Sequence, residues 1–378
     1  MKKACVIAHY GEDYFAYREQ FLSYLKNELN IDGIGVVPED DYSNKRIDSQ
    51  FKTYSYKYQR NWKFLFYIII VISRFKQIFK RENPDLVFTY KFFPNLIGVP
   101  IAKRSRVSVV AATIAGIGFL ENRDSSLLIK ILFKIYVKSL NNADYVIIQN
   151  RDDFEMFKKY LIRPKFILTN GSGVDKSRFE NIETNEVEFI KRNSLPTNKK
   201  FIVFCSRIVR SKGIFELIKG YKMASEKSIL KYNLIIAGWF DEAGIEEEVK
   251  KEINEIKGIH LLGYQKDVVS LIDLASCVIL PSYYPEGVPR SLTESLAMGK
   301  PIITTNHKGC RETCIDGENG YLIEPKSAID IRETILKFNS LNDLEIESME
   351  IKSLELFDQK FDQKVVFETI VKSMNLMK

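Results

Sequence analysis

The sequence predicts an α/β protein of two doubly wound domains, each a parallel sheet with helices on both faces. The chain has 378 residues, which is more than one ordinary hydrophobic core accommodates. Short apolar runs of strand composition alternate with longer segments of helical periodicity, once in each half of the chain. Because such alternation favours parallel sheets, we expect two domains facing each other, with a ligand beyond the carboxyl ends of the strands.

The first domain is expected at 1–180. Its strand candidates are the apolar runs at 4–10, 34–37, 86–90, 107–114, 145–149 and 166–169. Helical periodicity marks 15–29, 62–80 and 127–140. The Asn83-Pro84-Asp85 break ends the second of these helical segments before the next strand begins.

A polar stretch at 181–200 is the expected linker to a second domain at 201–361. Strands are expected there at 201–205, 234–237, 260–262, 278–280 and 302–305, and helices at 214–224, 245–256, 268–275 and 291–298. Two long helical patterns follow at 344–361 and 363–377. We expect the last one, about 362–378, to cross back to the first domain.

Cysteine usage and hydropathy favour a cytoplasmic protein. The five cysteines are an odd set whose spacing matches no zinc or disulfide scheme, so we expect reduced thiols. Residues 1–3 lead straight into a strand candidate, which is not the pattern of a secretory signal. The most apolar block, 64–72, has nine residues, whereas a membrane-spanning helix needs roughly 20.

One segment carries the positive charge of the chain. Residues 51–108 contain 12 basic and 2 acidic side chains, interspersed with aromatic residues. Such a segment fits the anionic inner face of the cytoplasmic membrane, and a solvated helix face explains it about equally well. Nucleic acid is not expected, because no binding motif accompanies the charge. The basic residues include Arg60, Lys63, Arg74, Lys76, Lys80, Arg81, Lys91, Lys103, Arg104 and Arg106.

The run from Glu286 to Glu294 predicts a phosphate site. A Gly-Val-Pro bend separates the two carboxylates, with Pro289 suited to the first position of a helix and Gly299 just past its end. A helix that begins there presents free backbone N–H groups and a partial positive charge to whatever precedes it.

Two basic residues complete this candidate site. Arg207 and Lys212 follow the strand candidate 201–205, on a loop that leads into a helix. An arginine with paired donors and a lysine with a point charge suit a diphosphate without a metal ion. We expect no metal or cofactor, because the sequence lacks a P-loop, a complete dinucleotide fingerprint, an Asp-x-Asp pair and a zinc-binding His-Glu-x-x-His motif.

Taken together, these motifs resemble retaining glycosyltransferases of the GT-B fold. The similarity is to glycosyltransferase family 4 (group 1), in the branch that builds bacterial capsules, lipopolysaccharides and polyprenyl-diphosphate-linked glycans. It covers most of the chain, and the matching motifs are Arg207-x4-Lys212, Glu286-x7-Glu294, Gly309-Cys310-Arg311-Glu312, the run 316–322, Gly116-Ile117-Gly118-Phe119, Gln149-Asn150 and the run 170–175.

The resemblance implies catalytic roles for three residues. Arg207 and Lys212 would hold the donor diphosphate and stabilise its growing charge. Glu286 would face the donor sugar as a hydrogen-bond acceptor and as a negative charge near the oxocarbenium-like centre.

The resemblance also implies donor-binding roles. The amides of Gly287 and Val288 would add to the diphosphate clamp, Glu294 would accept hydrogen bonds from the ribose, and Tyr264 would contact the base. Gly11 would approach the donor phosphates.

The first domain departs from the family pattern. Many relatives carry a histidine before the glycine pair, where this chain has Ala115 before Gly116 and Gly118. These glycines and His9 are assigned to the acceptor or donor side, and His9 is equally compatible with a place at the edge of the core.

The implied activity is retaining, metal-independent transfer of a hexose or N-acetylhexosamine. The donor would be a nucleotide-diphosphate sugar, with UDP expected, and the acceptor a polyprenyl-diphosphate-linked saccharide bound by the first domain at the inner face of the membrane. Two alternatives stay open: a non-catalytic glycosyltransferase-like scaffold of a membrane assembly complex, and a sugar-nucleotide epimerase, a class that lacks the Glu-x7-Glu pattern.

Overall fold

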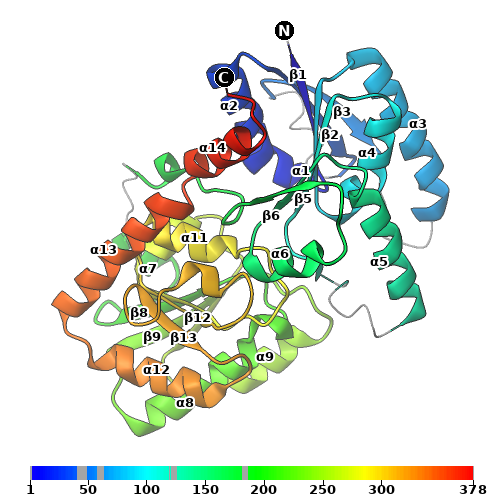
Figure 1. Cartoon of the computed structure of the whole chain (residues 1–378). Helices are drawn as coiled ribbons and strands as arrows, with labels where there is room; N and C mark the ends of the chain where they lie inside the picture. The colour runs from blue at the N-terminus through cyan, green and yellow to red at the C-terminus, as the bar shows by residue number, and fades with distance from the viewer. Residues whose placement is uncertain are drawn as a thin grey trace. The chain divides into compact units, whose positions relative to one another are not determined.

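The chain divides into two compact units (Figure 1), one formed by Met1–Ser172 with Val366–Lys378 and one by Gly173–Val365. The computed structural model describes residues 2–40, 49–57, 64–118, 120, 126–180 and 186–377. Both units are α/β with a parallel sheet, which confirms the predicted fold class.

The first unit contains a seven-stranded sheet in the order β3-β2-β1-β4-β5-β6-β7. Every neighbouring pair of strands is parallel. The strands are β1 (Lys3–Ile7), β2 (Asp32–Pro38), β3 (Lys52–Tyr56), β4 (Leu86–Tyr90), β5 (Val109–Ile114), β6 (Tyr145–Ile148) and β7 (Lys165–Leu168). The central strands are buried, as expected for a sheet covered on both faces.

Helices cover both faces of this sheet. One hydrophobic cluster joins the sheet to α3 (Phe64–Glu82), α4 (Phe92–Arg104), α5 (Leu127–Leu140) and α6 (Arg151–Lys158). A second cluster joins it to α2 (Glu19–Leu29) and α14 (Gln363–Ser373). A short α1 (Gly11–Asp13) and a π-helical turn at Tyr14–Arg18 lead from β1 into α2.

The end of α14 belongs to the core of the first unit. The ring centroid of Phe367 lies 5.0 Å from that of Phe21 and 5.5 Å from that of Tyr24. Ile370 and Val371 are buried in the same cluster. The second unit is therefore inserted between two parts of the first.

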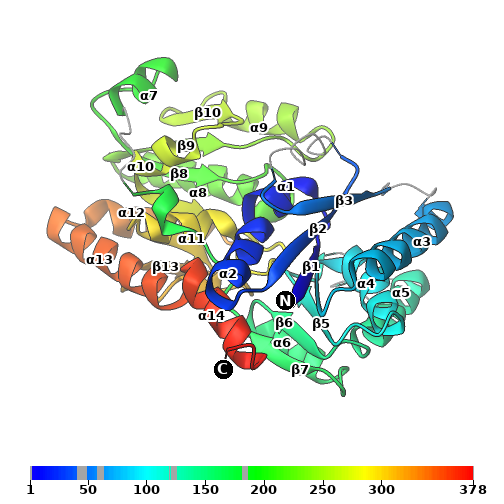
Figure 2. The same ribbon diagram turned by 90° about the horizontal axis from the view of Figure 1, so that it is seen from above.

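The second unit contains a six-stranded parallel sheet in the order β10-β9-β8-β11-β12-β13. The strands are β8 (Lys200–Cys205), β9 (Tyr232–Ala237), β10 (Ile259–Gly263), β11 (Ala275–Leu280), β12 (Ile302–Thr305) and β13 (Gly320–Ile323). The helices are α7 (Glu186–Arg192), α8 (Ile214–Lys227), α9 (Ile245–Ile253), α10 (Val268–Asp273), α11 (Arg290–Ala297), α12 (Ala328–Ser340) and α13 (Asp343–Lys360). Figure 2 shows β8, β9 and β10 of this sheet side by side.

The region predicted as a linker differs from the expectation. The second unit begins at Gly173, because Val174 donates a backbone hydrogen bond to Phe361 (2.9 Å) and accepts one from Gln363 (3.0 Å). Within the expected linker, α7 buries Phe189 in the core of the second unit. Residues 181–185 lie outside the described part of the chain.

Several elements were not predicted from the sequence: β3, β13, α4, α6, α7 and α12. In addition, the expected helix at 62–80 begins in the structure at Phe64, and Trp62 and Lys63 lie outside the described residues, as does Arg60. Among the described helices, none is long and apolar enough to cross a membrane.

Candidate functional site

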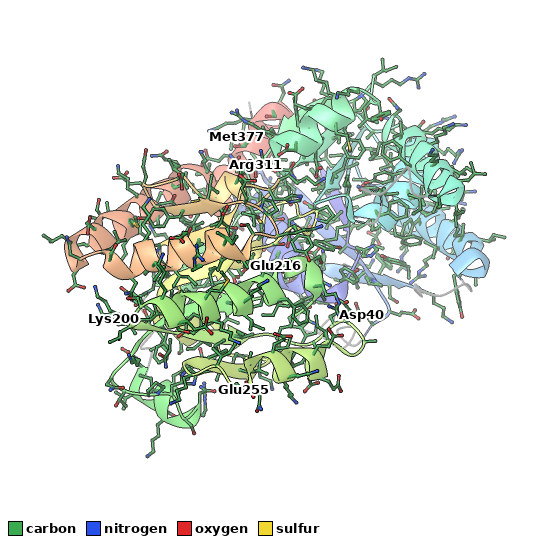
Figure 3. The ribbon with its side chains drawn as sticks, turned by 90° about the horizontal axis from the view of Figure 1, so that it is seen from below. Asp40, Lys200, Glu216, Glu255, Arg311 and Met377 are labelled. Atoms are coloured by element: carbon green, nitrogen blue, oxygen red, sulfur yellow. The ribbon has the colours of Figure 1, made fainter. Side chains whose placement is uncertain are left out.

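The candidate site lies at the point where the strand order in the sheet of the second unit reverses. From β8 the chain continues through β9 and β10 on one side, whereas β11, β12 and β13 follow on the other. The loops after the neighbouring strands β8 and β11 therefore diverge, and such a point in a parallel sheet is the usual place for a ligand. Arg207 and Lys212 come from the first loop, and Glu286 comes from the second. Lys200 marks the opposite end of β8 (Figure 3).

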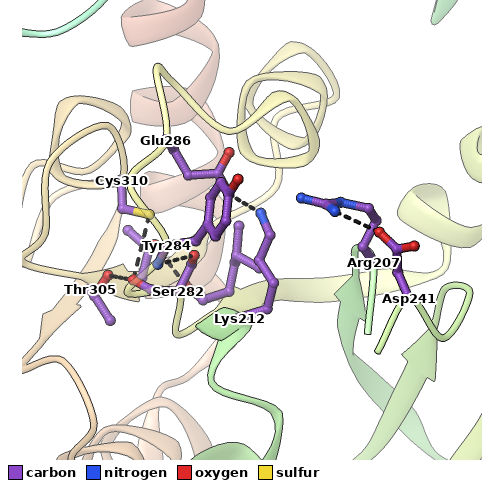
Figure 4. Close-up of polar contacts among 10 residues, drawn as sticks. Arg207, Lys212, Asp241, Ser282, Tyr284, Glu286, Thr305 and Cys310 are labelled. Atoms are coloured by element: carbon purple, nitrogen blue, oxygen red, sulfur yellow. Dashed lines mark hydrogen bonds and ion pairs between the residues drawn. The ribbon is translucent and has the colours of Figure 1, made fainter. Parts of the chain in front are cut away.

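Lys212 and Glu286 form an ion pair across these two loops (Figure 4). The Lys212 side chain is 7% exposed, and that of Glu286 is 17% exposed. Burial lowers the pKa of Lys212 to about 8, the nearby Arg207 charge contributes to the lowering, and Cys310 opposes it. The pair leaves a cation with little solvent around it, which strengthens its interaction with an anionic ligand.

Arg207 lies beside this pair and is less buried. Its guanidinium donates to Asp241 Oδ2 at 2.7 Å, and its side chain is 35% exposed. In Figure 4 the guanidinium and the Lys212 ammonium point toward the same space. Both cations also approach the Tyr284 ring, at 5.6 and 5.8 Å from its centroid. Two cations thus converge at one point, as the sequence predicted for this pair.

Close backbone contacts fix the loop that carries Glu286. A Cβ added to Gly309 would lie 2.4 Å from the carbonyl oxygen of Gly287, and φ of Gly309 is +78°. A Cβ added to Gly213 would lie 2.2 Å from the carbonyl oxygen of Pro281. Only glycine allows these approaches without displacing the loop.

Polar contacts beneath the loop hold it further. Thr305 donates its hydroxyl to the carbonyl oxygen of Ser282, and the Cys310 thiol lies 4.0 Å from the same oxygen. The backbone N–H of Tyr284 donates to the Ser282 hydroxyl at 3.2 Å. These groups connect the end of β12 to the loop after β11, so that Glu286 occupies a defined position.

Glu294 lies on α11, one turn after Arg290, which donates to it at 2.8 Å. Burial raises the pKa of the Cys205 thiol, at the end of β8, to about 12, and the negative charge of Glu294 is the second cause of this rise. Glu294 therefore lies close to the end of β8. The helix spans Arg290–Ala297, close to the expected 291–298. Pro289 is its N-cap, one position before the first helical position for which the sequence suited it, and Gly299 lies past its end as predicted. Gly287 and Val288 lie in the loop just before it.

Tyr264 follows β10 and is 60% exposed. Its ring meets that of Trp239, which is 48% exposed, edge to face at a centroid distance of 6.0 Å. The sequence reasoning missed Trp239. The signal that could have found it is its position directly after the Ala237-Gly238 end of β9, at the same sheet edge.

The first unit holds the remaining predicted residues near its own change of strand order, between β1 and β4. His9 is buried with its ring edge-on to Tyr10, at 4.3 Å between centroids. The N–H of Gly11 donates to Asp40 Oδ2 at 2.7 Å, so this amide is occupied within the protein. Gly116 and Gly118 lie on the loop after β5, following Ala115.

A buried charged cluster near this point was also missed. Arg18 donates to Asp13 at 3.0 Å, and both side chains are less than a tenth exposed. Burial by itself would raise the pKa of Asp13, but the charges of Arg18 and Lys91 hold it below its usual value. Lys91 lies 3.8 Å from Asp13, and its own side chain is 32% exposed.

Metal-binding geometry was searched through the described parts of both units. There, no three or more His, Cys, Asp and Glu side chains come together in a way that could hold a metal ion. Cys310 and Cys314 are buried free thiols in the second unit.

Two family models match different parts of the chain and together cover most of its length. The model "Glycosyl transferase 4-like" matches residues 3–150, and "Glycosyl transferases group 1" matches residues 185–350. The chain belongs to the group 1 glycosyltransferase family.

Curated relatives agree with this membership. The chain is 24% identical to the Campylobacter jejuni N,N'-diacetylbacillosaminyl-diphospho-undecaprenol alpha-1,3-N-acetylgalactosaminyltransferase, over 87% of each chain. It is 26% identical to the Staphylococcus aureus capsular polysaccharide biosynthesis glycosyltransferase CapM, over 54% of this chain and 53% of that protein. The second alignment therefore spans only about half of each protein.

Solved structures share the fold. A glycosyltransferase from Rickettsia africae has a TM-score of 0.81 at 18% identity, covering 100% of this chain and 99% of that one. Anabaena Alr3699/HepE, in complex with UDP and glucose, has a TM-score of 0.81 at 16% identity, covering 100% of each. The fold of this family member is therefore the predicted GT-B fold, with two Rossmann-like domains.

Proposed function

We propose that this glycosyltransferase-family chain transfers a sugar from a UDP-sugar to a polyprenyl-diphosphate-linked saccharide during surface polysaccharide or glycan assembly, with retention at the anomeric carbon and without a metal ion. The observation that carries the proposal is the convergence of Lys212, Glu286 and Arg207 at the point where the strand order of the second unit reverses. The Campylobacter relative, whose name includes diphospho-undecaprenol, supports the acceptor class.

The two cations would neutralise the donor diphosphate. In the transfer, the bond between the anomeric carbon and the diphosphate oxygen breaks, and negative charge grows on that oxygen. Lys212 lies in a poorly solvated position, where a charge interaction is stronger than in water. Arg207 is more exposed and offers several N–H donors in a plane, which suits two phosphate oxygens at once.

Glu286 would act on the sugar. Its carboxylate is held by Lys212 and by the close approach of Gly309 to the Glu286-Gly287 backbone. A fixed carboxylate beside the anomeric carbon stabilises positive charge as the carbon–oxygen bond lengthens. In the retaining reaction proposed here, the acceptor hydroxyl bonds to the anomeric carbon from the side of the leaving diphosphate, and its proton passes to the diphosphate oxygen.

The nucleoside would lie toward the exposed aromatic pair. Trp239 and Tyr264 present ring surface at the same sheet edge as Arg207. Aromatic rings of this kind stack on bases. Glu294 would accept hydrogen bonds from the ribose, as its place on α11 after the Glu286 loop suggests.

The test is a donor panel with the nucleotide released as the readout. The purified chain is mixed with UDP- and other nucleotide-sugars and a polyprenyl-diphosphate disaccharide, with and without EDTA, and the anomeric configuration of the product is read by NMR. We expect UDP to be released only when acceptor is present, at a rate that EDTA does not change. The anomeric configuration of the sugar in the product should be the same as in the donor. An inverted product, or a requirement for a divalent metal, would contradict the mechanism.

The matched variants are Glu286→Gln and Glu255→Gln. Glu286→Gln keeps the shape of the side chain and removes the charge, so transfer should fall by about 10²–10³-fold. Glu255 is an exposed carboxylate between α9 and β10 (Figure 3), and its substitution should leave the rate unchanged. No sugar transfer from any donor, together with UDP binding by calorimetry, would favour the non-catalytic scaffold instead.

A further inference from the structure

The helices on one face of the first unit carry an unusual outer surface. In both ribbon views α3, α4 and α5 lie together along one side of this unit (Figures 1 and 2), and α4 packs against both of its neighbours. Their buried sides meet in one hydrophobic cluster against the sheet. What remains outside is therefore the face that they offer to solvent or to a partner.

The outer face of α5 is apolar at four positions. Leu127 is 74% exposed, Leu128 66%, Ile131 44% and Ile135 49%. Spacings of one, three and four residues keep these side chains on one side of a helix. Phe133, Tyr136 and Leu140 occupy the opposite, buried side. No core position accounts for the four exposed aliphatic residues, and a cluster of this kind marks an interaction surface.

Lysines follow the same outer face. Lys130, Lys134 and Lys138 are exposed and are spaced four residues apart, so that they form a second row beside the aliphatic one. The helix contains no acidic residue. A helix with a basic row beside an exposed aliphatic row is the kind that lies in the interface of an anionic membrane, where long lysine side chains reach the headgroups.

The neighbouring helices extend this pattern. On α3, Ile69 is 74% exposed and Ile70 51%, both near its beginning, and exposed basic residues follow toward its end. The α4 helix has no acidic residue, and the one on α3, Glu82, is buried against Lys3 and Lys52. The basic residues of the three helices are Arg74, Lys76, Lys80, Arg81, Lys103, Arg104, Lys130, Lys134 and Lys138.

The position of the aliphatic residues along the helices is also informative. Each of α3, α4 and α5 follows a strand of a parallel sheet and returns to the next, so each begins at the carboxyl edge of the sheet. Of the exposed leucines and isoleucines, Leu127, Leu128 and Ile131 lie in the first half of α5, and Ile69 and Ile70 lie in the first half of α3, near this edge; Ile135 lies just past the middle of α5. His9 and Lys91 follow β1 and β4 at the same edge.

We infer that the beginnings of α5 and α3 insert their exposed aliphatic side chains into an anionic lipid bilayer, with the flanking lysines and arginines on the headgroups. This inference changes the expected membrane-binding surface, which the sequence placed in the basic segment 51–108. Most of the exposed aliphatic residues lie on α5, outside that segment. The inference goes beyond the proposed sugar transfer and does not depend on which donor is used. It places the carboxyl edge of the first unit next to the lipid that carries the acceptor.

The experiment is flotation of the purified chain with vesicles. One set contains phosphatidylcholine alone, and the other contains phosphatidylcholine with phosphatidylglycerol. We expect binding to the anionic vesicles, weakened by salt because surface charge is screened. The triple variant Leu127→Gln/Leu128→Gln/Ile131→Gln should lose about tenfold or more in partitioning, and Lys130→Gln/Lys134→Gln/Lys138→Gln a comparable amount.

The matched controls are aliphatic residues exposed elsewhere. Ile162 is 93% exposed in the first unit and Ile229 is 90% exposed in the second, and Ile162→Gln/Ile229→Gln should float like the parent. Hydrogen exchange of the first-unit amides reports whether each variant keeps the fold of that unit. UDP binding by calorimetry reports on the second unit alone, so a failure of the proposed sugar transfer would show separately. The inference would be overturned if the triple variant Leu127→Gln/Leu128→Gln/Ile131→Gln floated as well as the parent, or if the parent did not float with anionic vesicles at low salt.

A second copy of the chain is the other occupant that this face could take. Light scattering distinguishes the two cases. A parent that is dimeric and a leucine variant that is monomeric, with equal flotation of both, would overturn the membrane assignment in favour of self-association.

Discussion

The two units place charged residues at the same topological position and expose them differently. Each sheet reverses its strand order beside its first strand, β1 in one unit and β8 in the other. In the first unit, Arg18 and Asp13 are both almost fully buried and satisfy each other. In the second, Lys212 is buried, but its partner Glu286 and the adjacent Arg207 reach solvent.

From this difference we expect the Arg18–Asp13 pair to be structural and the Lys212–Glu286 pair to bind ligand. Arg18 also lies 4.2 Å from the centroid of the Tyr90 ring and donates to the Ser172 hydroxyl at 3.2 Å, so its position is fixed within its own unit. Arg207, in contrast, pairs with Asp241 on an exposed loop. We expect substitutions at Arg18 to reduce stability and substitutions at Lys212 to reduce activity, and the predictions below test this separation.

The largest expected effect is on stability, in the first unit. Arg18→Met leaves the buried Asp13 carboxylate without its main partner, which should lower the free energy of unfolding by about 3–5 kcal/mol. The measurement is hydrogen exchange of the first-unit amides, which reads this unit separately from the other. UDP affinity should not change.

The double variant Arg18→Met/Asp13→Asn is the control for this substitution. It removes the stranded charge and should recover part of the lost stability. An Arg18→Met variant as stable as the parent, but unable to bind UDP, would reverse the comparison between the two units.

Lys212→Ala should reduce sugar transfer by about 10²–10³-fold, because it removes the buried cation at the candidate site. The measurement is the initial rate of UDP release with acceptor present. Lys250→Ala is the control, since Lys250 pairs with Glu246 on the exposed face of α9. Transfer at the parental rate by the Lys212 variant would show that the buried ion pair has a structural role, like that of Arg18.

Gly309→Ala should lower stability by about 1–3 kcal/mol and weaken UDP binding, because its new Cβ would displace the Gly287 carbonyl. Gly317→Ala isolates the backbone effect: Gly317 has φ of +80° and nothing within 4 Å of the added Cβ. Thermal unfolding and calorimetry are measured on both variants. Equal UDP affinity in the two would show that the position of the Glu286 loop does not control donor binding.

The smallest expected effect is on pH dependence. With its pKa lowered to about 8 by burial, Lys212 loses its proton at moderately alkaline pH, and a bound diphosphate favours the protonated form. UDP affinity should therefore be constant below about pH 8 and fall above it, by up to about tenfold per pH unit. Calorimetry between neutral and alkaline pH measures the slope. Lys212→Arg should flatten it, because arginine stays charged.

The sequence predicted most of the fold because the main elements have clear periodicity. The core strands β4 and β12 have the predicted bounds, as does α5. In contrast, α4 was missed because its sequence contains two prolines and a glycine and is apolar on nearly every side. The strand β3 was missed because it lies at the edge of its sheet and reads Lys-Thr-Tyr-Ser-Tyr, with little apolar content.

The location of the candidate-site residues on the sheet could be predicted from the sequence, but their contacts could not. Arg207, Lys212 and Glu286 lie at one sheet edge, as their positions after strand candidates indicated. The ion pair between Lys212 and Glu286 joins residues 74 positions apart, and no local pattern encodes it. The Arg18 and Asp13 pair lies in a π-helical segment and the turn before it, which helical periodicity does not distinguish from an ordinary helix.

The return of α14 to the first unit has a consequence for how the protein is made. The second unit is one continuous stretch, Gly173–Val365, so all of its core residues are available before α14 is complete. The first unit, although synthesised earlier, needs Phe367, Ile370 and Val371 to cover Phe21 and its neighbours. Until those residues leave the ribosome, that face of the older half of the chain stays open to water and to chaperones, and the unit that is begun first is completed last.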